Sequence, residues 1–296
     1  MKNIISKIPY LRYAFFYREN SAHRPGHYYS PVVDLTDLAG RKESIWKKDR
    51  TLDGIDFNVA KQESFLDNLI QNDKTIPFSE NQDKDYRYYF DNKTYAHADG
   101  LVLFTMLNTL KPKRLIEVGS GFSSALILDT KDKFLNYPLE LTFIDPNPQD
   151  RLYGLLKKED YNTTTIVADI VQNTPVETFK KLGENDILLI DNSHVSKTGS
   201  DVNYLMTEIL PSLNKGVVVH IHDIFYPFEY PAEWLFQHRL NWNEIYSVHN
   251  FLLFNNVYKI IFFSDYIQQK YEDKLKDKAP VFFKDRPGSM WIQRVF

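Results

Sequence analysis

Short apolar segments alternate with helical segments from residue 98 onward, and this alternation restricts the fold more than any other feature of the sequence. Five segments have strand character: Arg114–Val118, Leu139–Ile144, Thr164–Val167, Ile187–Ile190 and Val217–Ile221. Helical patterns precede or separate them over 99–110, Ser123–Thr130 and Asp201–Leu210. Strands that are apolar along their whole length are buried on both faces, so the sequence predicts a parallel sheet with helices on both sides.

The rest of the chain flanks this array. Residues 1–95 are polar and aromatic, and we expect them to form a helical cap, with helices at Leu35–Leu38 and Phe57–Leu69 and a connector at 71–93. A helix and two more strands follow the array, at Trp242–Phe254, Val257–Phe263 and Met290–Val295. We therefore predict a cap or lid over 1–95 and one α/β domain over 96–296.

Composition excludes several classes of protein. Of 296 residues, 43% are hydrophobic and 25% charged, which is typical of a globular chain and not of a disordered one. A net charge of -3 offers no basic footprint, so we expect no nucleic-acid partner. The chain has no cysteine, which excludes disulfides and thiolate chemistry and favours a cytoplasmic location.

The N-terminal 20 residues mix basic and aromatic side chains. Lys7, Pro9 and Arg12 interrupt any signal-peptide core, and the apolar runs of the chain are too short to span a bilayer. We expect no stable membrane insertion. The segment could lie on a membrane surface, or pack on its own domain or on a sister subunit of a homo-oligomer.

The first strand runs into a glycine turn. Arg114–Ser124 is predicted to be strand, turn and helix, with Gly119 and Gly121 where the backbone turns beside a ligand. A helix N-terminus at that place offers free N–H groups to an anionic or polar ligand. A tight turn without a ligand is the alternative. Ser124 replaces the third glycine of the dinucleotide fingerprint, which disfavours NAD.

Acidic residues close the next two strands. Asp145 ends the second strand and Asp169 the third. A carboxylate at such a strand end can accept both hydroxyls of an adenosine ribose, and a second one beside it could meet the adenine amino group. A helix N-cap explains either aspartate alone equally well. Three polar strand ends in succession favour the ligand.

These residues resemble the class I S-adenosylmethionine-dependent methyltransferases. Glu117-Val-Gly-Ser-Gly121 is similar to motif I of that family, and Asp145 and Asp169 are similar to its acidic second and third strand ends. The resemblance covers roughly residues 95–296. It implies a Rossmann-like, seven-stranded, mostly parallel sheet with an antiparallel last strand, an ending that NAD-binding Rossmann domains lack.

Two later segments narrow the resemblance. Asp191–Asp201 and His220–Pro227 resemble a bacterial subgroup of small-molecule methyltransferases, often grouped with antibiotic-sugar O-methyltransferases. The aromatic-rich segments Tyr86–Phe90 and Phe225–Trp234 are expected either to flank the acceptor crevice or only to join the cap to the core.

The resemblance implies S-adenosyl-L-methionine as the cofactor. The residues expected to bind it are Glu117, Gly119, Ser120, Gly121, Ser123, Ser124, Asp145 and Asp169. Glu117 and the glycine turn should face its methionine end, with hydroxyl contacts from the two serines after the turn. Asp145 should bind the ribose, and Asp169 should lie near the adenine.

Four side chains are expected beside the acceptor: Asp191, His194, His222 and Asp223. They follow the fourth and fifth strands, which are neighbours in a class I sheet. Methyl transfer is an in-line displacement that depends on positioning, and a hydroxyl acceptor must also lose its proton to a base or be acidified by a metal. We predict His194 as the base, with Asp191 and His222 beside it. A hydrogen-bonded loop histidine without chemistry is the alternative.

The resemblance also raises a divalent metal, because some relatives bind a cation through acids at these two strand ends. The candidate ligands are Asp191, His222 and Asp223. Mg²⁺ would prefer a carboxylate where His222 stands, so imidazole would shift the preference toward Mn, Fe, Ni or Zn. His220, inside the strand, is expected to be a buried histidine whose hydrogen bonds are satisfied.

We thus expect a methyltransferase that acts on a hydroxyl of a small polar metabolite, such as a sugar or a secondary metabolite. One alternative is a catalytically silent cofactor-binding partner protein. An NAD-dependent oxidoreductase is a weaker alternative. The sequence holds no Gly-x-Ser-x-Gly nucleophile elbow, which disfavours a hydrolase.

Overall fold

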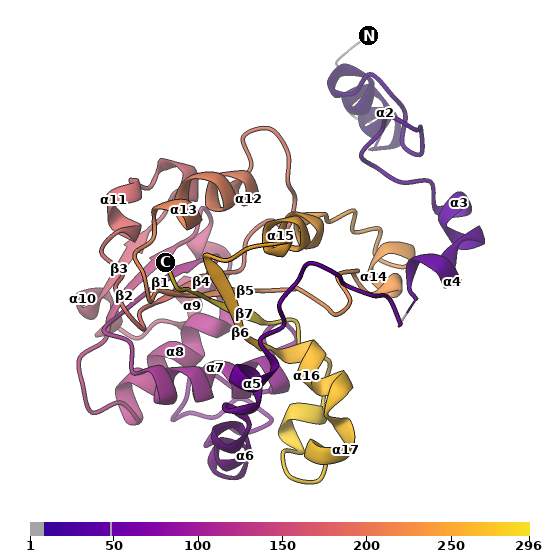
Figure 1. Ribbon diagram of the computed structural model, residues 1–296. Coiled ribbons are helices and arrows are strands. Elements are labelled where there is room, and N and C mark those ends of the chain that lie inside the picture. The colour runs from indigo at the N-terminus through magenta and orange to yellow at the C-terminus, as the bar shows by residue number, and fades with distance from the viewer. Residues whose placement is uncertain (1–8, 48) are drawn as a thin grey trace. The chain divides into compact units, whose positions relative to one another are not determined.

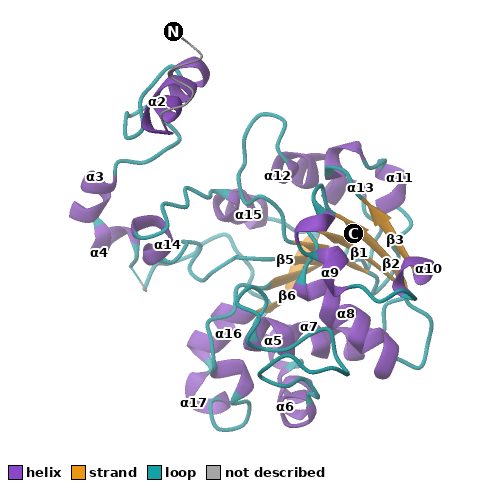
Figure 2. Cartoon of the chain, turned by 180° about the vertical axis from the view of Figure 1, so that it is seen from behind, coloured by secondary structure: helices purple, strands orange, loops and turns teal. Residues whose placement is uncertain are grey.

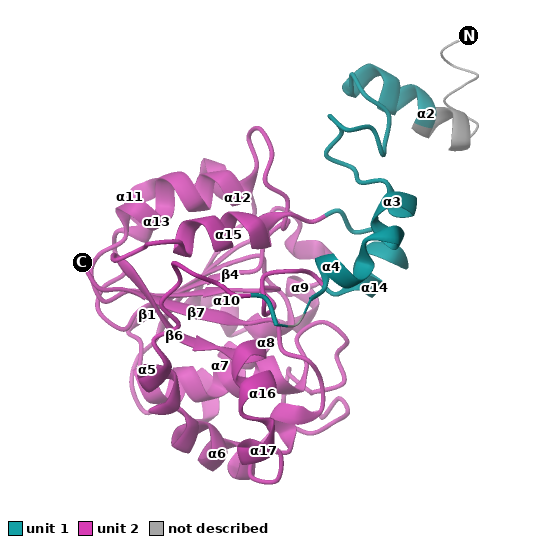
Figure 3. Ribbon diagram, turned by 45° about the vertical axis from the view of Figure 1, so that its right-hand side comes forward, with its two compact units in different colours: residues 1–50, 231–241 teal, residues 51–230, 242–296 magenta. Residues whose placement is uncertain are grey.

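The computed structural model describes residues 9–47 and 49–296, so the first eight residues of the basic and aromatic segment lie outside the described residues. The chain forms two compact units (Figure 3): residues 1–50 with 231–241, and residues 51–230 with 242–296. Residues 51–95 therefore belong to the unit that contains the sheet. The cap boundary at residue 95 and the lid role stay predictions.

A seven-stranded sheet forms the centre of the larger unit, in the order β3-β2-β1-β4-β5-β7-β6. The strands are β1 Arg114–Val118, β2 Glu140–Ile144, β3 Thr164–Val167, β4 Ile187–Ile190, β5 Val218–Ile221, β6 Tyr258–Phe263 and β7 Met290–Arg294. The strands β1 to β5 pair in parallel, whereas β7 is antiparallel to both β5 and β6. The predicted mostly parallel sheet with an antiparallel last strand is confirmed.

Helices cover both faces of this sheet (Figures 1 and 2). On one face lie α5 Val59–Glu63, α6 Leu66–Thr75, α7 His97–Leu110, α8 Phe122–Lys133 and α16 Ser264–Lys270. On the other face lie α11 Val176–Phe179, α12 Asp201–Tyr204, α13 Leu210–Ser212 and α15 Glu244–Leu252. Every residue of β4 and β5 is buried, as the apolar runs predicted.

Shorter elements complete the larger unit. They are α9 Leu152–Leu155, α10 Asp160–Thr163, α17 Glu272–Leu275, the 3₁₀ turns η1 Pro148–Asp150, η2 Val171–Asn173 and η4 Val281–Phe283, and the π-turn η3 Leu205–Ile209. The segment predicted to be helical over Phe57–Leu69 forms two separate helices, α5 and α6, and α6 runs on to Thr75 into the predicted connector. The chain breaks at Phe65, whose ring packs against Phe262 at 4.9 Å between centroids, so tertiary packing overrides the local pattern.

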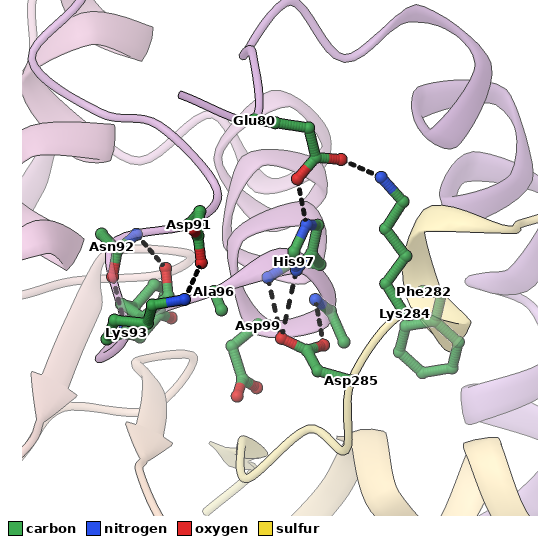
Figure 4. Close-up of polar contacts among 12 residues, drawn as sticks. Glu80, Asp91, Asn92, Lys93, Ala96, His97, Asp99, Phe282, Lys284 and Asp285 are labelled. Atoms are coloured by element: carbon green, nitrogen blue, oxygen red, sulfur yellow. Dashed lines mark hydrogen bonds and ion pairs between the residues drawn. The ribbon is translucent and has the colours of Figure 1, made fainter. Parts of the chain in front are cut away.

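The N-terminus of α7 is fixed by a carboxylate that is distant in sequence (Figure 4). Asp285 accepts the backbone N–H groups of His97 at 3.0 Å and Ala98 at 2.8 Å, two of the donors that a helix start leaves free. The His97 ring contacts Glu80 at 2.7 Å. These bonds join α7 to the segment that leads into β7, and Asp99 adds two more by accepting from Gly288 and Ser289.

A buried arginine joins α8 to α10. Arg87 donates to Asp129 at 2.7 Å and to both oxygens of Asp160 at 2.8 and 2.9 Å, and it pairs with Asp132 at 2.9 Å. The side chains of Arg87 and Asp129 are 3% and 0% exposed. A buried guanidinium requires such partners, so this cluster fixes the loop before α7 against the helices.

The smaller unit contains four helices within its described residues: α2 Pro9–Asn20, α3 Leu35–Gly40, α4 Lys42–Ile45 and α14 Ala232–Phe236. Asp34 caps α3 by accepting from the N–H groups of Thr36 and Asp37. The inserted segment 231–241 joins this unit through Trp46, whose ring lies 5.8 Å from that of Phe236.

Candidate active site

A cleft of about 580 Å³ lies at the carboxyl ends of the parallel strands. Its lining comes from the loops after β1, β2, β3 and β4: Val118, Gly119, Ser120, Ile144, Asp145, Pro146, Asn147, Asp150, Arg151, Ile170, Val171, Gln172, Asp191, Asn192, Ser193, Lys197, Gly199, Ser200 and Asp201. The sheet order reverses between β1 and β4, and ligands of open α/β sheets bind at such a switch point.

The glycine turn after β1 forms one wall of the cleft. Gly119 has φ +81°, and a Cβ on it would lie 1.7 Å from the carbonyl oxygen of Asp191. A Cβ on Gly121 would meet the Arg151 side chain at 2.9 Å. At Gly119 only glycine allows the turn to lie this close to the neighbouring backbone, so the sequence signal at that position had a steric cause.

Asp145 lies at the end of β2, in the cleft wall, with a fixed carboxylate. It accepts the N–H of Ser120 at 2.9 Å through one oxygen and the N–H of Asn147 at 2.7 Å through the other. These bonds leave further acceptor capacity on both oxygens. The turn after β1 and the acid after β2 are thus held together, as their spacing predicted.

Asp169, unlike Asp145, is not part of the cleft wall. Its carboxylate is exposed, accepts the N–H of Ile170 at 2.7 Å and binds the Asn173 side chain at 3.0 and 3.1 Å. The residues that follow it, 170–172, line the cleft, whereas Asp169 is not in the lining. Its adenine contact stays a prediction.

Glu117 lies beneath the glycine turn and is fully buried. The Ser124 hydroxyl donates to it, and the N–H of Gly121 donates to Ser124 at 3.0 Å. Burial raises the pKa of Glu117 to about 8, although Ser123 and Ser124 lower it. Glu117, Ser123 and Ser124 therefore form a buried layer that supports the turn.

His194 lies between three carboxylates at the ends of β4 and β5 and the start of α15. Its Nε2 is 3.3 Å from an oxygen of Asp191 and 3.4 Å from one of Asp223, and its Nδ1 is 2.9 Å from Glu244. His222 Nε2 is 3.7 Å from Asp223. The predicted convergence of Asp191, His194, His222 and Asp223 is thus visible, and Asp191 also lines the cleft.

Two of these residues have left-handed backbone. His194 has φ +57° and Asp223 has φ +58°, conformations that are uncommon for residues other than glycine. The backbone directly after Asp223 is anchored, because the N–H of Ile224 donates to the carbonyl of Gly288 at 2.8 Å. Strained backbone of this kind concentrates at functional sites.

The charges of the cluster are coupled. Burial alone would lower the pKa of His194; the hydrogen bonds of its ring to Asp191 and Glu244 outweigh burial and raise that pKa well above the ordinary 6.5, and nearby Asp223 adds to the effect. Burial would raise the pKa of Asp191, but charge on His222 and the bond to His194 lower it to about 2. Burial raises the pKa of Asp223 to about 6. The carboxylates around His194 therefore favour its protonated form.

Behind this cluster four buried rings lie in contact. Tyr95 stacks on His222 at 5.0 Å, His222 on His220 at 5.5 Å, and His220 meets the edge of Trp291 at 4.6 Å. Burial lowers the pKa of His220 well below 6.5, so this ring is neutral. His220 lies inside β5 and is buried, as the alternation along the strand predicted. The expectation that its hydrogen bonds are satisfied is wrong, because neither ring nitrogen has a hydrogen-bond partner among the described residues.

The metal hypothesis finds no support. Among residues 9–47 and 49–296, no group of three or more His, Cys, Asp or Glu side chains is arranged to hold a metal ion. The ligand set predicted from Asp191, His222 and Asp223 is therefore dropped. The group that lies next to both Asp191 and Asp223 is the His194 ring, through its Nε2.

Several cleft and cluster residues were not predicted. Arg151 and Lys197 bring cations to the cleft, and Glu244 supplies the third carboxylate around His194. Arg151 follows the Asp145 strand end by six residues, so its proximity to the turn could have been inferred. Glu244 lies 50 residues after His194 at the start of a helix, and no local motif marks it.

Part of the chain is similar to known proteins. Residues 116–224 match the family model of a methyltransferase domain. An uncharacterized protein of Archaeoglobus fulgidus is 31% identical over 168 residues, which are 55% of this chain and 75% of that protein. No helix in the described part of the chain is long and apolar enough to cross a membrane.

Solved methyltransferase structures are more distant. An SAH-bound methyltransferase of Podospora anserina is 17% identical with a TM-score of 0.46, covering 90% of this chain and 99% of that one. A putative O-methyltransferase of Klebsiella pneumoniae is 11% identical with a TM-score of 0.41, covering 78% of this chain and 90% of that one. A coclaurine N-methyltransferase is 13% identical with a TM-score of 0.39, covering 88% of this chain and 90% of that one.

Proposed function

We propose that this chain, whose residues 116–224 match the methyltransferase domain family, is an S-adenosylmethionine-dependent methyltransferase that methylates an oxygen atom of a small polar metabolite. A sugar or sugar-like secondary metabolite is the proposed acceptor class, which would place the chain with the antibiotic-sugar O-methyltransferases. The observation that carries the proposal is the position of His194 between Asp191 and Asp223, next to the cleft.

The cleft residues fit the cofactor. Gly119 leaves no room for a Cβ, Ser120 presents its backbone at the turn, and Asp145 keeps free acceptor capacity for the ribose hydroxyls. Glu117 and the two serines that follow the turn support it from beneath. When bound, S-adenosylmethionine supplies the methyl group as an electrophile at the sulfonium.

The cluster at β4 and β5 would take the proton of the acceptor. His194 Nε2 is the nitrogen that points toward Asp191 and Asp223, because Nδ1 is engaged by Glu244. Asp191 and Asp223 offer acceptors that would orient a hydroxyl. Because the raised pKa favours the protonated ring, His194 accepts the acceptor's proton only from its neutral form, and activity should increase as pH rises.

The experiment is a screen of monosaccharides, methyl glycosides and phenolic glycosides with S-adenosylmethionine, read as release of S-adenosylhomocysteine. We expect release with at least one hydroxylated acceptor, and a loss of roughly 10²–10⁴-fold in turnover for His194→Ala with unchanged cofactor affinity. Wild-type turnover in His194→Ala would remove His194 as the base. Tight binding of S-adenosylhomocysteine without transfer to any acceptor would favour a cofactor-binding partner protein.

A further inference from the structure

Glu244 is a buried carboxylate that no motif explains. It is 2% exposed and stands at the first position of the nine-residue helix α15. One carboxylate oxygen accepts from His194 Nδ1 at 2.9 Å, and the other accepts from the Asn192 side chain at 2.8 Å. Buried carboxylates are tolerated when both oxygens have partners, and here both partners come from the loop after β4.

The same helix end holds the backbone of that loop. The N–H groups of Asn243 and Glu244 donate to the carbonyl oxygen of His194 at 3.0 and 3.1 Å. The N–H of His194 donates to the Asn192 side chain at 2.8 Å. These bonds hold His194 in its left-handed backbone conformation, with φ +57°. The start of α15 therefore fixes both the main chain and the ring of one residue.

We propose that Glu244 is a positioning residue for methyl transfer, which holds the His194 ring with Nδ1 protonated so that Nε2 faces the acceptor. The proposal rests on the proposed role of His194 as base. With Nδ1 donating to Glu244, the working nitrogen is Nε2, which already lies 3.3 and 3.4 Å from Asp191 and Asp223. The Trp242 ring, 4.4 Å from the imidazole, limits its rotation.

A structural role of Glu244 is the competing explanation, because an acidic side chain in the first turn stabilises a helix through its dipole. The two roles differ in what they change. A helix-stabilising carboxylate would alter unfolding without altering the state of the imidazole. A positioning carboxylate fixes which ring nitrogen keeps its proton when the ring is neutral, and its effect on turnover disappears when His194 is absent.

The first test is spectroscopic and needs no acceptor. The full chain, labelled with ¹⁵N-histidine and saturated with S-adenosylhomocysteine, is compared with Glu244→Gln and with Glu272→Gln, an exposed carboxylate paired with Lys276. We expect a hydrogen-bonded Nδ1 proton, assigned to His194 by its loss in His194→Ala, in the wild type and in Glu272→Gln. That signal should shift or vanish in Glu244→Gln. An unchanged signal would overturn the proposal.

The second test is a double-mutant cycle on turnover, with the acceptor that releases most S-adenosylhomocysteine in the screen. Glu244→Gln should lower turnover by roughly 10- to 100-fold with unchanged affinity for S-adenosylhomocysteine, as removing the orienting partner of a functional histidine typically does. Adding Glu244→Gln to His194→Ala should cause no further loss. An equal loss in both backgrounds would assign Glu244 a structural role only.

The outcomes separate the two proposals. Normal turnover in His194→Ala contradicts the proposed base, whereas a loss in His194→Ala with normal turnover in Glu244→Gln contradicts only the positioning role. If Glu244→Gln does not fold, Glu244→Asp takes its place, because it keeps the charge at the helix start but is one methylene too short to reach Nδ1. That variant should show the same spectroscopic and kinetic losses.

Discussion

Gly119 and Asp191 are in direct backbone contact, because a Cβ on Gly119 would lie 1.7 Å from the carbonyl oxygen of Asp191. The glycine turn after β1 thereby contacts the end of β4, where the proposed cofactor cleft meets the proposed acceptor site. Gly119→Ala should push the glycine turn away from the backbone of Asp191, and it should also strain residue 119, whose φ is +81°. We expect a lower melting temperature and at least a tenfold loss of affinity for S-adenosylhomocysteine by calorimetry.

The matched control is Gly154→Ala. Gly154 lies in α9, and a Cβ on it meets nothing within 4 Å. This variant should bind like the wild type and unfold at the same or a slightly higher temperature, since alanine favours a helix more than glycine does. Normal affinity in Gly119→Ala would show that the turn adapts.

Asp145→Ala tests the ribose contact. It removes the acceptor of two backbone N–H groups and the proposed partner of the ribose hydroxyls. We expect affinity for S-adenosylhomocysteine to weaken by about 1–3 kcal/mol, the usual cost of unpairing buried polar groups. Asp91→Ala, at an exposed ion pair with Lys93, is the control. Equal affinities in both variants would remove Asp145 from the ribose site.

The strands of the sheet could largely be predicted from the sequence, whereas the long-range contacts of the site residues could not. Apolar runs located β4 at Ile187–Ile190, because a strand buried on both faces must be apolar throughout. Gly119 was readable because only glycine permits that turn. The contact of Glu244 with His194 spans 50 residues and depends on where α15 docks, which no local pattern encodes.

Folding of the N-terminal region shows the same limit. The pattern over 57–69 is helical, yet Phe65 turns inward to Phe262 and divides it. Residues 231–241 join residues 1–50 in one unit, a long-range pairing that the single predicted boundary at residue 95 did not contain. Local propensity predicts elements, and packing decides where they break and what they join.

The pH dependence of turnover follows from the charge on His194. Its pKa is raised well above 6.5 by the bonds to Asp191 and Glu244, and the form that acts as a base is the neutral one. Turnover should therefore fall as pH falls through that raised pKa, with the rising limb at more alkaline pH than an ordinary histidine gives. A profile that is flat from pH 6 to about 9 would contradict a titrating His194 in this range.

Arg87→Met tests the buried ion cluster. It would leave the buried carboxylates of Asp129 and Asp160 without their cation. Removing one partner of a buried ion pair leaves the other charge buried and unpaired. We therefore expect a loss of about 3–5 kcal/mol in the free energy of unfolding, measured with urea. Lys276→Met, at an exposed pair with Glu272, should cost less than about 1 kcal/mol. Similar small losses in both would mean that the cluster relaxes.

The stability of the chain should also carry a pH signature from Glu117. Its pKa is raised by burial from 4.5 to about 8, so the folded state holds a proton that the unfolded state releases. The contribution of Glu117 to the free energy of unfolding is fully present below pH 4.5. It declines as pH rises toward 8, by about 1.4 kcal/mol per pH unit. Glu117→Gln keeps an acceptor for Ser124 and removes the titration. Urea unfolding from pH 5 to about 9 should show the wild type losing stability relative to Glu117→Gln, and parallel curves would contradict a raised pKa.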